Sequence, residues 1–510
     1  MKQIKVTING KEIKTTEGKT ILEVVHENKI DKIPILCHDD RIEPYGSCFL
    51  CVVEVEGMNK LAASCCTPIA GGMVIQTDSE RIRASRKSAL ELLLSNHYAD
   101  CIGPCIDNCP AHVDAQGYIA LVSMGKYEEA LKLIKEQNPL PLSIGRVCVR
   151  DCEVACRRQI IDEPVGINHL KRYVADMDAQ GKHQWVPGIK KSSGKKVAVV
   201  GGGPSGLTCA YYLTLEGHSV TIYEKLPRLG GMLMYGIPEY RLPKKILEDE
   251  IKWITNLGVT VKTNVELGKD FDSHSLLNDG FDALYLAVGA HKASNMRLEH
   301  ENDTKGVMWG IDFLRGLPYK VPVLKGTVIV VGGGNTAIDA ARTALRCGAY
   351  TVNIVYRRSI KEMPAHPEEI HAAQEEGIDI HFLTNPSAIT RDKNKTLKGI
   401  QCLKMRLEQA KPGERPRPVP IEGSEFEMAC DFLIGAIGQQ VDTSFNAGNP
   451  KPGVQLERWG TINIENNTMV TSIPGVFAGG DVVTGPDIAI RAIASGKHAA
   501  VGIHEYLRSK

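Results

Sequence analysis

The spacing of the cysteines constrains this chain more than any other feature of its sequence. Eleven of its 15 cysteines precede residue 160, and most of them recur at short intervals. Cysteines at such intervals are typical ligands of iron–sulfur clusters, and in a reducing compartment they favour metal binding over disulfides. The sequence therefore predicts clusters held by two groups of ligands. These are Cys37, Cys48, Cys51 and Cys65 in the first group and Cys101, Cys105, Cys109, Cys148, Cys152 and Cys156 in the second.

Length and charge narrow the class of protein. A chain of 510 residues predicts three or four domains, and its apolar content of 43% is enough for their cores. The 61 basic and 60 acidic residues give no reason to expect nucleic acid or a charged membrane surface as a partner. The first residues lack the apolar core of a signal peptide, and no apolar run approaches the roughly 18 residues of a membrane span. We therefore expect a cytoplasmic protein.

Residues 1–85 have the pattern of a small β-grasp domain. Ile4, Val6 and Ile8 alternate with polar residues before an Asn-Gly turn, and Thr20 can cap a short helix. The first cysteine group follows as C-x10-C-x2-C-x13-C. The stretch PYGSCFLCVVEVEG…LAASCCTP resembles the N-terminal [2Fe–2S] domain of iron-only hydrogenases and of the large iron–sulfur subunit of respiratory complex I. This resemblance implies that Cys65 is the fourth ligand, with Cys66 as the alternative.

Residues 86–185 are expected to form a helical cluster domain. The pieces C-x3-CP, GYIALVSMGKYEEALKLIKEQNPLP and GRVC…CE.AC resemble the cluster domain of the glutamate synthase small subunit and of dihydropyrimidine dehydrogenase. The resemblance implies two [4Fe–4S] clusters with crossed ligation. The first would take Cys101, Cys105 and Cys156, and the second would take Cys109, Cys148 and Cys152.

The ligand set departs from that family at two positions. The first run has three cysteines where the family has four, and the segment LLLSNHYADC resembles the hydrogenase segment in which a histidine binds a [4Fe–4S] cluster. His97 is therefore a candidate ligand, and the alternative is a histidine that caps the end of a helix. Lys171 stands where the family places a Glu or Gln ligand. The fourth ligand of the second cluster is left unassigned, so that one or two [4Fe–4S] clusters are expected.

A glycine-rich loop follows the strand VAVV. Gly201 allows the tight turn, Gly203 lets the backbone approach a pyrophosphate, and Gly206 lets the next helix pack on the strand. Glu224 ends the following strand, where an acid can bind ribose hydroxyls. Residues 190–320 and 440–510 are therefore predicted to form an FAD-binding domain, with a second dinucleotide-binding domain inserted at residues 321–439.

Two further segments are expected to complete the FAD site. The glutamate synthase resemblance implies that LGGMLMYGIPEYRLPKKIL wraps the flavin ring. Arg241 in this segment can meet a phosphate of FAD or of the nicotinamide nucleotide, and a surface ion pair is the alternative. Asp481 follows two glycines and can bind the ribityl hydroxyls. Cys209 is expected to be a core residue.

The inserted domain repeats the strand–loop–helix plan as Gly332, Gly334 and Ala337. Arg357 and Arg358 end its second strand, where an acid would favour NAD. Two guanidinium groups can hold a 2′-phosphate, so NADP is preferred; the alternative is a solvated strand end. Hydride transfer between nicotinamide and flavin requires alignment rather than an acid, so no catalytic base is assigned. The predicted cofactor-binding residues are Gly201, Gly203, Pro204, Ser205, Gly206, Glu224, Lys225, Gly230, Gly231, Met232, Arg241, Gly332, Gly334, Asn335, Thr336, Arg357, Arg358, Gly480 and Asp481.

Across residues 90–510 the chain resembles the small subunit of NADPH-dependent glutamate synthase. With its additional [2Fe–2S] domain it is also similar to the flavin subunits of NADH-dependent ferredoxin:NADP oxidoreductases, some of which bifurcate electrons. The resemblance implies hydride exchange between NADP(H) and FAD, followed by single-electron relay through the clusters. The implied partners are an NADH-dehydrogenase-like flavin subunit or ferredoxin, in a transhydrogenase-type complex.

Two other functions are weighed against this one. The first is a glutamate synthase small subunit that feeds a glutamate-forming large subunit; the additional [2Fe–2S] domain argues against it. The second is a conducting scaffold without nucleotide chemistry, which the two intact glycine loops disfavour. A thioredoxin-reductase-like activity is excluded because residues 321–440 carry no C-x-x-C pair.

Overall fold

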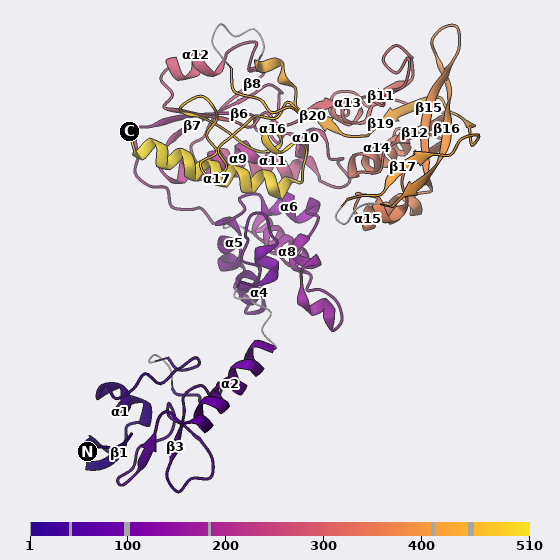
Figure 1. Cartoon of the computed structure of the whole chain (residues 1–510). Helices are drawn as coiled ribbons and strands as arrows, with labels where there is room; N and C mark the ends of the chain where they lie inside the picture. Colours follow the sequence, from indigo (N-terminus) through magenta and orange to yellow (C-terminus); the bar gives the residue numbers. More distant parts are fainter. Residues whose placement is uncertain (1, 40–42, 96–101, 182–184, 410–413, 447–452) are drawn as a thin grey trace. The chain divides into compact units, whose positions relative to one another are not determined.

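The computed structural model describes residues 2–39, 43–95, 102–181, 185–409, 414–446 and 453–510. The chain divides into two compact units, Met1–Cys101 and Ile102–Lys510. Each unit is visible in Figure 1, where colour follows the sequence. The predicted multidomain α/β class is confirmed by the separate sheets described below.

The N-terminal unit is built on one five-stranded sheet with the order β2-β1-β5-β3-β4. Strands β1 and β2 form the predicted hairpin, and Thr20 caps α1 through a capping box with Glu23. Its core contains the alternating Val6 and Ile8 of β1. The elements are β1 (Gln3–Ile8), β2 (Lys11–Thr16), α1 (Ile21–Glu27), β3 (Val52–Val55), β4 (Ala62–Ala63), β5 (Val74–Gln76) and α2 (Glu80–Ser95).

Helix α2 belongs to this N-terminal unit. Arg86 on α2 donates hydrogen bonds to the carbonyl oxygens of Val52 (2.9 Å) and Thr77 (3.1 Å). Ile82 is the fully buried residue of the helix, whereas Leu92 and Leu94 are exposed. The helix therefore packs on the sheet through its first half.

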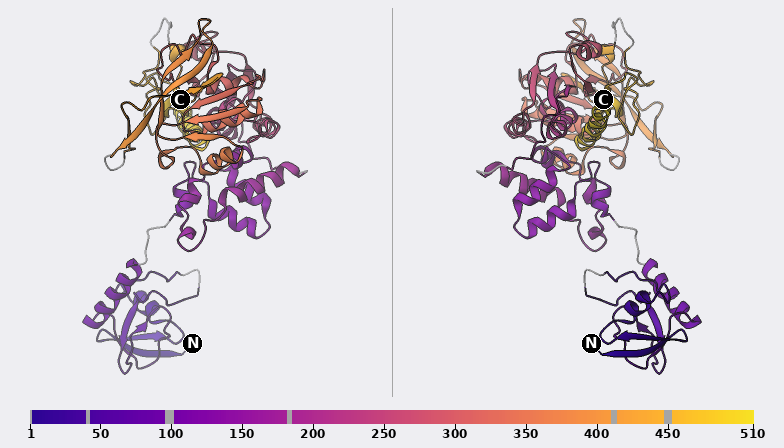
Figure 2. Two further views of the ribbon diagram at one scale, coloured as in Figure 1. Left: turned by 90° about the vertical axis from the view of Figure 1, so that its right-hand side faces the viewer. Right: turned by 90° about the vertical axis from the view of Figure 1, so that its left-hand side faces the viewer.

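Short helices carry the second group of cysteines. They form a compact violet group in both views of Figure 2. Helices α4, α5 and α8 pack around Tyr118 and Ile134, and Tyr118 donates a hydrogen bond to the carbonyl oxygen of Ile167 at 2.7 Å. The elements are α3 (Pro104–Asp107), α4 (Ala115–Ser123), α5 (Tyr127–Lys135), α6 (Pro141–Val147), α7 (Asp151–Val154), η1 (Arg157–Ile160) and α8 (Ile167–Gln180).

The first dinucleotide-binding sheet is parallel and has the order β21-β9-β6-β7-β8. Strands β6, β7, β9 and β21 are mostly buried, as expected for a parallel sheet that is covered by helices, whereas the edge strand β8 is exposed. Helix α17 lies against α9 on one face. The elements are β6 (Lys196–Val200), α9 (Pro204–Leu215), β7 (Ser219–Glu224), α10 (Met232–Tyr235), α11 (Lys244–Thr255), β8 (Thr260–Thr263), α12 (Ser273–Asn278), β9 (Ala283–Leu286), β21 (Val476–Ala478), α16 (Asp481–Thr484) and α17 (Ala489–Arg508).

A second parallel sheet has the order β11-β19-β12-β13-β14. It takes in β11, which precedes the boundary predicted at residue 321, and that boundary stays a prediction. An antiparallel sheet lies beside it. The two segments that connect the first parallel sheet to the second pair with each other as the antiparallel ribbon β10–β20. The elements are β10 (Lys292–Ala293), β11 (Val307–Trp309), α13 (Gly310–Gly316), β12 (Thr327–Val331), α14 (Asn335–Arg346), β13 (Thr351–Val355), η2 (Ile360–Glu362), α15 (Pro367–Glu375), β14 (Asp379–His381), β15 (Thr384–Arg391), β16 (Leu397–Glu408), β17 (Arg417–Pro420), β18 (Phe426–Ala429), β19 (Phe432–Gly435), β20 (Gln439–Gln440) and η3 (Thr443–Asn446).

Candidate functional site

The first glycine loop connects β6 to the N-terminus of α9. Gly201 has φ +105°, and a Cβ at this position would lie 2.2 Å from the carbonyl oxygen of Ala287. A Cβ on Gly206 would lie 1.9 Å from the carbonyl oxygen of Gly201. Glycine at both positions therefore allows strand, turn and helix to pack closely, which leaves the first amides of α9 at the end of the strand.

Glu224 closes the side of this loop. Its carboxylate accepts hydrogen bonds from the backbone N–H groups of Gly202 and Leu226, each at 2.8 Å. Burial raises the pKa of Glu224, and the two N–H donors oppose that rise. The carboxylate is thereby held at the end of β7, where its remaining lone pairs can accept from ribose hydroxyls.

A large cavity of about 770 Å³ opens beside this loop and lies within the second unit. Gly203 and Gly231 meet at its wall, where a Cβ on Gly231 would lie 2.8 Å from the Cα of Gly203. This volume is in the range of sites for drug-sized and cofactor-sized ligands. The predicted residues that line it are Gly201, Gly203, Pro204, Ser205, Glu224, Lys225, Gly231, Met232, Arg241, Asn335, Thr336, Gly480 and Asp481.

The C-terminal acid Asp481 lies in this cavity at the start of α16. Gly480 before it has φ +72°, and its N–H donates to the Ser495 hydroxyl at 2.8 Å. Burial raises the pKa of Asp481 to about 7. The glycine loop, Glu224 and Asp481 thus surround one cavity, a cradle that fits the predicted FAD.

Lys225 and Gly230 have other surroundings. Lys225 lines the cavity but pairs with Glu266 at 3.0 Å. Gly230 has φ +115°, and a Cβ there would lie 3.0 Å from the Cβ of Met234. Gly230 therefore allows the turn into α10 and does not line the cavity.

The second glycine loop connects β12 to α14. Gly332 has φ +148°, and a Cβ there would lie 2.2 Å from the carbonyl oxygen of Ala436. Gly334 has no atom within 4 Å of its Cβ position, so the helix N-terminus has open space in front of it. Asn335 Oδ1 accepts the N–H of His366 at 3.0 Å, which ties the following loop to this turn. Asn335 and Thr336 also line the large cavity, so the two nucleotide loops share it.

The two arginines after β13 differ in their contacts. Arg358 Nε donates to the carbonyl oxygen of Pro416 at 3.0 Å. The Arg357 residue as a whole is exposed, but partial burial of its guanidinium, together with the charges of Arg358 and Arg297, lowers the pKa of that group. Neither arginine lines the large cavity. The three guanidinium groups form a positive site at the strand end, and this chemistry suits a 2′-phosphate.

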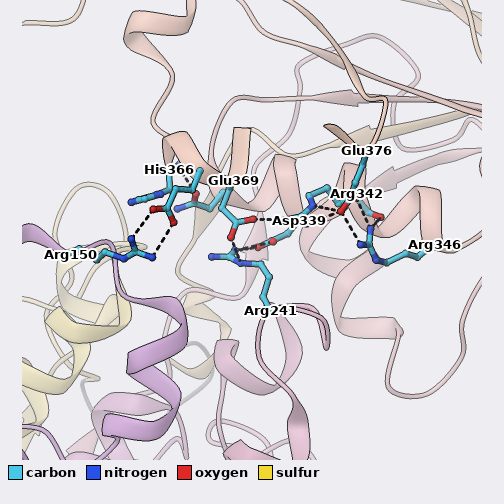
Figure 3. A network of polar contacts seen from close by, with 10 residues as sticks. Arg150, Arg241, Asp339, Arg342, Arg346, His366, Glu369 and Glu376 are labelled. Atoms are coloured by element: carbon cyan, nitrogen blue, oxygen red, sulfur yellow. Dashed lines mark hydrogen bonds and ion pairs between the residues drawn. The ribbon is translucent and has the colours of Figure 1, made fainter. Parts of the chain in front are cut away.

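Arg241 joins the flavin segment to the inserted domain. Its Nη1 donates to both oxygens of Asp339 at 2.8 and 2.9 Å, and its Nε lies 3.0 Å from Glu369. Arg342 continues the network to Glu369 (2.6 Å) and Glu376 (2.7 Å), as Figure 3 shows. The guanidinium is only 13% exposed, so this ion pair is buried and not the surface pair that was the alternative.

The second cysteine group surrounds a small pocket of about 30 Å³. Burial raises the pKa of the Cys152 thiol to about 12, and the Lys171 ammonium opposes that rise. Cys105 and Cys156 interact electrostatically with each other. The cysteines that line this cysteine pocket are Cys105, Cys109, Cys148 and Cys152. Three thiols of the predicted second cluster therefore meet at one place, a donor set that fits iron–sulfur ligation.

The cysteine pocket and the large cavity share a wall. Val147 and Val149 line the large cavity, whereas Cys148 between them lines the cysteine pocket. At the start of α17, Ala489 lines the cavity and Ile490 lines the pocket. Single residues therefore separate the predicted flavin site from the predicted second cluster.

The first cysteine group is gathered in the N-terminal unit as two pairs. The Cys37 sulfur accepts hydrogen bonds from the backbone N–H groups of Cys48 and Ser47, which lower the pKa of the Cys37 thiol to about 7. Burial raises the pKa of the Cys65 thiol to about 12, and the neighbouring thiols of Cys51 and Cys66 raise it further. Such a pairing is the arrangement that two iron atoms bridged by sulfide require.

Other features of this group concern the alternative ligand. Cys66 is exposed, and a Cβ on Gly46 would lie 2.6 Å from its sulfur. Cys65 is 1% exposed and belongs to the core of the unit. The environment of Cys65 favours it over Cys66 as the fourth ligand, and both assignments stay predictions.

Two predicted ligands, His97 and Cys101, lie outside the described residues. Within the described ranges, no three His, Cys, Asp or Glu side chains are placed to hold a single metal ion. No described helix combines the length and apolar composition needed to cross a membrane. Cys209 is completely buried on α9, as expected for a core residue.

Several residues of these sites were not singled out by sequence reasoning. Asp339 and Arg415 line the large cavity, as does His291, whose pKa burial lowers to about 4. Lys497 reaches the cysteine region from α17. A signal existed for Asp339, which follows the glycine loop on the same helix; the others come from segments whose sequence carries no motif.

Two Rossmann-like sheets around a shared cavity, next to a cysteine-lined helical group, define a flavoprotein of the dinucleotide-dependent oxidoreductase class. Residues 195–496 match the family model "pyridine nucleotide-disulphide oxidoreductase", and the chain belongs to this family. Residues 95–183 match dihydropyrimidine dehydrogenase domain II with a 4Fe-4S cluster, and residues 1–80 match a 2Fe-2S iron–sulfur cluster binding domain. The predicted FAD, NADP(H), [2Fe–2S] and [4Fe–4S] cofactors are confirmed at the level of these families.

Two bacterial relatives match most of this chain. The chain is 44% identical over 429 residues to the NADP(+)-dependent formate dehydrogenase subunit beta of Moorella thermoacetica, covering 79% of this chain and 60% of that one. It is 41% identical to the NADPH-Fe(3+) oxidoreductase subunit beta of Geobacter sulfurreducens, over 79% of this chain and 63% of the relative. The chain thus spans under two thirds of these relatives.

One relative is matched over most of its length. The chain is 34% identical to the glutamate synthase [NADPH] small chain of Escherichia coli, over 79% of this chain and 88% of the relative. The predicted resemblance to that subunit is therefore confirmed. A mutant of FprA from Mycobacterium tuberculosis has the same fold, with a TM-score of 0.54, 19% identity, and coverage of 62% of this chain and 85% of that one.

Proposed function

We propose that this chain is an electron-transfer subunit that links NADP(H) to a partner redox protein. Bound FAD would accept a hydride from the nicotinamide and release its electrons one at a time. The residues of the large cavity would hold the two nucleotides, and the cysteine pocket would hold the cluster that accepts electrons first. The N-terminal [2Fe–2S] centre would be the exit toward the partner.

The wall between the large cavity and the cysteine pocket carries this proposal. Cys148 belongs to the pocket while its neighbours Val147 and Val149 belong to the cavity. A thiolate ligand at this position would be adjacent in sequence to two residues that line the predicted flavin site. Because valine side chains exclude water, the wall would let an electron pass without giving solvent access to the reduced flavin.

The two glycine loops have the task of alignment. Both lie at helix N-termini and both open into one cavity, where Asn335 and Thr336 meet the flavin side. Backbone amides at these ends stabilise the two pyrophosphates. Hydride transfer in this arrangement depends on how the two rings are held, and it needs no proton donor from the protein.

The names of the relatives support a role within a complex. Both the formate dehydrogenase relative and the Fe(3+) oxidoreductase relative are described as beta subunits. We propose an NADH-dehydrogenase-like flavin subunit or ferredoxin as the partner, in a cytoplasmic transhydrogenase-type complex. A glutamate-forming large subunit is the alternative partner, in line with the glutamate synthase relative.

Anaerobic reduction tests the proposal. The full chain is purified without oxygen, loaded with iron, sulfide and FAD, and mixed with one equivalent of NADPH. The flavin absorbance should bleach first, and a [4Fe–4S] signal in electron paramagnetic resonance should follow. Cys148→Ser should retain flavin bleaching and lose that signal, because it removes the thiolate next to the flavin.

Cys209→Ala is the matched control, because Cys209 is a buried cysteine that lines neither site. This variant should behave as the wild type. A flavin that NADPH does not reduce, or clusters that remain oxidised after the flavin is reduced, would contradict the proposal. Proteins that purify with the chain then distinguish a flavin dehydrogenase partner from a glutamate-forming one.

A further inference from the structure

Two lysines approach the cysteine pocket from different helices. Lys171 comes from α8 and lines the pocket itself. Lys497 comes from α17, whose first turn forms part of the wall toward the large cavity. Neither position belongs to a glycine loop or to a cysteine motif, so the chemistry described above leaves both unassigned.

Lys171 contributes a positive charge to the pocket, and within the described part of the chain its side chain makes no hydrogen bond that links two elements. Its side chain is buried, with 7% of the residue exposed, and it acts electrostatically on the Cys152 thiol. Among the described residues, no hydrogen bond or ion pair is recorded for its ammonium. A buried ammonium without an acid partner is costly, so its presence beside three thiols calls for a compensating negative charge at the pocket.

Lys497 approaches the same group of thiols from α17. Its ammonium donates to the carbonyl oxygen of Ala111 at 2.9 Å and to the Gln137 side chain at 2.5 Å. These neutral acceptors hold the group without cancelling its charge. The ammonium interacts electrostatically with Cys109, which lies two residues before Ala111. The two lysines therefore act on two different cysteines of the predicted second cluster.

Acidic groups share this region. Asp151 lines the pocket, and Glu153 acts electrostatically on Cys152 while it accepts the N–H of Asn168 at 2.8 Å. Without the lysines, a cluster on three thiolates would face two partly buried carboxylates. Adding an electron there would be opposed by every nearby negative charge, and the net charge around a cluster is one determinant of its reduction potential.

We propose that Lys171 and Lys497 raise the reduction potential of the cluster at Cys109, Cys148 and Cys152, so that it accepts electrons from the neighbouring flavin. This inference rests on the proposed function. The redox step is the addition of one electron to the cluster, with the flavin as the donor in turnover. The lysines do not ligate iron; they stabilise the reduced form through charge.

The test is a redox titration of the anaerobic, cluster-loaded full chain, followed by electron paramagnetic resonance. Dithionite supplies one electron per cluster, and Cys148→Ser identifies the signal of this cluster. Lys171→Leu should lower the equilibrium constant for reduction at least tenfold, which is about 59 mV more negative for one electron. Lys497→Met should shift it in the same direction. Lys171→Arg should keep the wild-type potential, because it keeps the charge.

Lys135→Met is the control variant. Lys135 is equally buried in the same helical group, but it pairs with Asp178 at 3.8 Å and stacks on Trp253. Its removal should leave the potential of the cluster unchanged. Leucine is chosen at position 171 because it offers no lone pair to iron, whereas glutamine would supply a possible ligand.

Distinct outcomes would overturn the inference. An unchanged reduction potential in Lys171→Leu would show that the charge of Lys171 does not affect the cluster. Loss of one iron, seen as a three-iron signal in Lys171→Leu, would make Lys171 a ligand and overturn it as well. A wild-type chain that assembles no cluster at these cysteines would instead refute the proposed function, so the two failures are distinguishable.

Discussion

Glu250 on α11 caps the helix that leads to the cysteine pocket, and the backbone N–H of Ser143 donates one of the two hydrogen bonds. The Glu250 carboxylate accepts the backbone N–H of Ser143 at 2.9 Å and that of Leu142 at 2.7 Å. Both N–H groups belong to the first turn of α6, which ends at Val147 beside the shared wall. An acid of the flavin domain thus stabilises the N-terminus of a helix in the cluster domain.

The first prediction concerns this cap. Burial raises the pKa of Glu250 to about 7 from a usual value of 4.5. Because the folded protein holds the proton more tightly than the unfolded chain, the free energy of unfolding should decrease as the pH rises from about 4.5 to 7. Urea unfolding over this range should show a shallower pH dependence for Glu250→Gln than for the wild type.

Removal of the cap should also cost stability. Glu250→Ala leaves two buried N–H groups unpaired, and we expect a loss of about 2 kcal/mol in the free energy of unfolding. Glu248→Ala is the control on the same helix, because Glu248 makes a partly exposed ion pair with Arg228 at 3.4 Å. That variant should change stability by less than about 0.5 kcal/mol. Equal effects of the two variants would rule out the capping role.

The second prediction concerns the buried ion pair of Arg241 and Asp339. Burial raises the pKa of Asp339 to about 6 although Arg241 opposes that rise. Arg241→Met should cost about 3 to 5 kcal/mol, because it leaves a buried carboxylate without its partner. The double variant Arg241→Met with Asp339→Leu should recover part of this loss. Unfolding of each variant in urea gives the coupling energy, and strictly additive losses would contradict the prediction.

The exposed pair of Lys245 and Asp249 provides the comparison for this cycle. It lies on the same segment of chain as Arg241, but its members are largely exposed. Lys245→Ala should change the free energy of unfolding by less than about 1 kcal/mol, since solvent screens the pair.

The third prediction separates two glycines of one loop. A Cβ on Gly203 would lie 3.7 Å from the nearest atom, the Cα of Gly231, which is an ordinary contact. Gly203→Ala should therefore fold, but its methyl group would meet the pyrophosphate of FAD, so that the purified protein carries little flavin. Gly206→Ala should fail to fold, because its Cβ would lie 1.9 Å from the carbonyl oxygen of Gly201. Circular dichroism and flavin content distinguish the two, and a Gly203→Ala protein with full flavin content would refute the assignment.

The fourth prediction concerns the choice of nicotinamide cofactor. Arg357→Ala should weaken NADPH binding on the order of tenfold to a hundredfold and leave NADH unchanged, because it removes a charged donor to the 2′-phosphate. Titration of each nucleotide against flavin absorbance measures this. Arg406→Ala, at an exposed position of the same domain, should alter neither affinity. Equal weakening of NADPH and NADH binding would support the alternative interpretation, in which Arg357 is a solvated residue at the end of a strand.

Local sequence patterns were enough to predict elements of the N-terminal unit and the loops of the nucleotide sites. The alternation of Val6 and Ile8, the cap at Thr20, and the glycine loops at Gly201 and Gly332 each depend on a few neighbouring residues. Such features follow from backbone sterics and short-range hydrogen bonds, so they can be predicted from neighbouring residues in the sequence. The cysteine spacings could be interpreted for the same reason.

The neighbours of each site could not be predicted in this way. Arg241 was expected to meet a phosphate or to form a surface ion pair, and it forms a buried ion pair with Asp339, which lies 98 residues away. The approach of Lys497 to Cys109 joins segments separated by most of the chain. Contacts of this kind depend on how sheets and helices pack, and many sequences with the same local patterns would pack differently.

The sequence by itself thus determined which chemistry the chain carries, because thiol spacing and glycine loops are local requirements of clusters and pyrophosphates. The tertiary structure alone decided that Val147, Cys148 and Val149 divide their side chains between the large cavity and the cysteine pocket. The physical reason is that the direction of a side chain becomes meaningful only once another part of the chain has packed against it. The spatial order of the flavin and the clusters depends on that packing, whereas the kinds of cofactor that the chain binds do not.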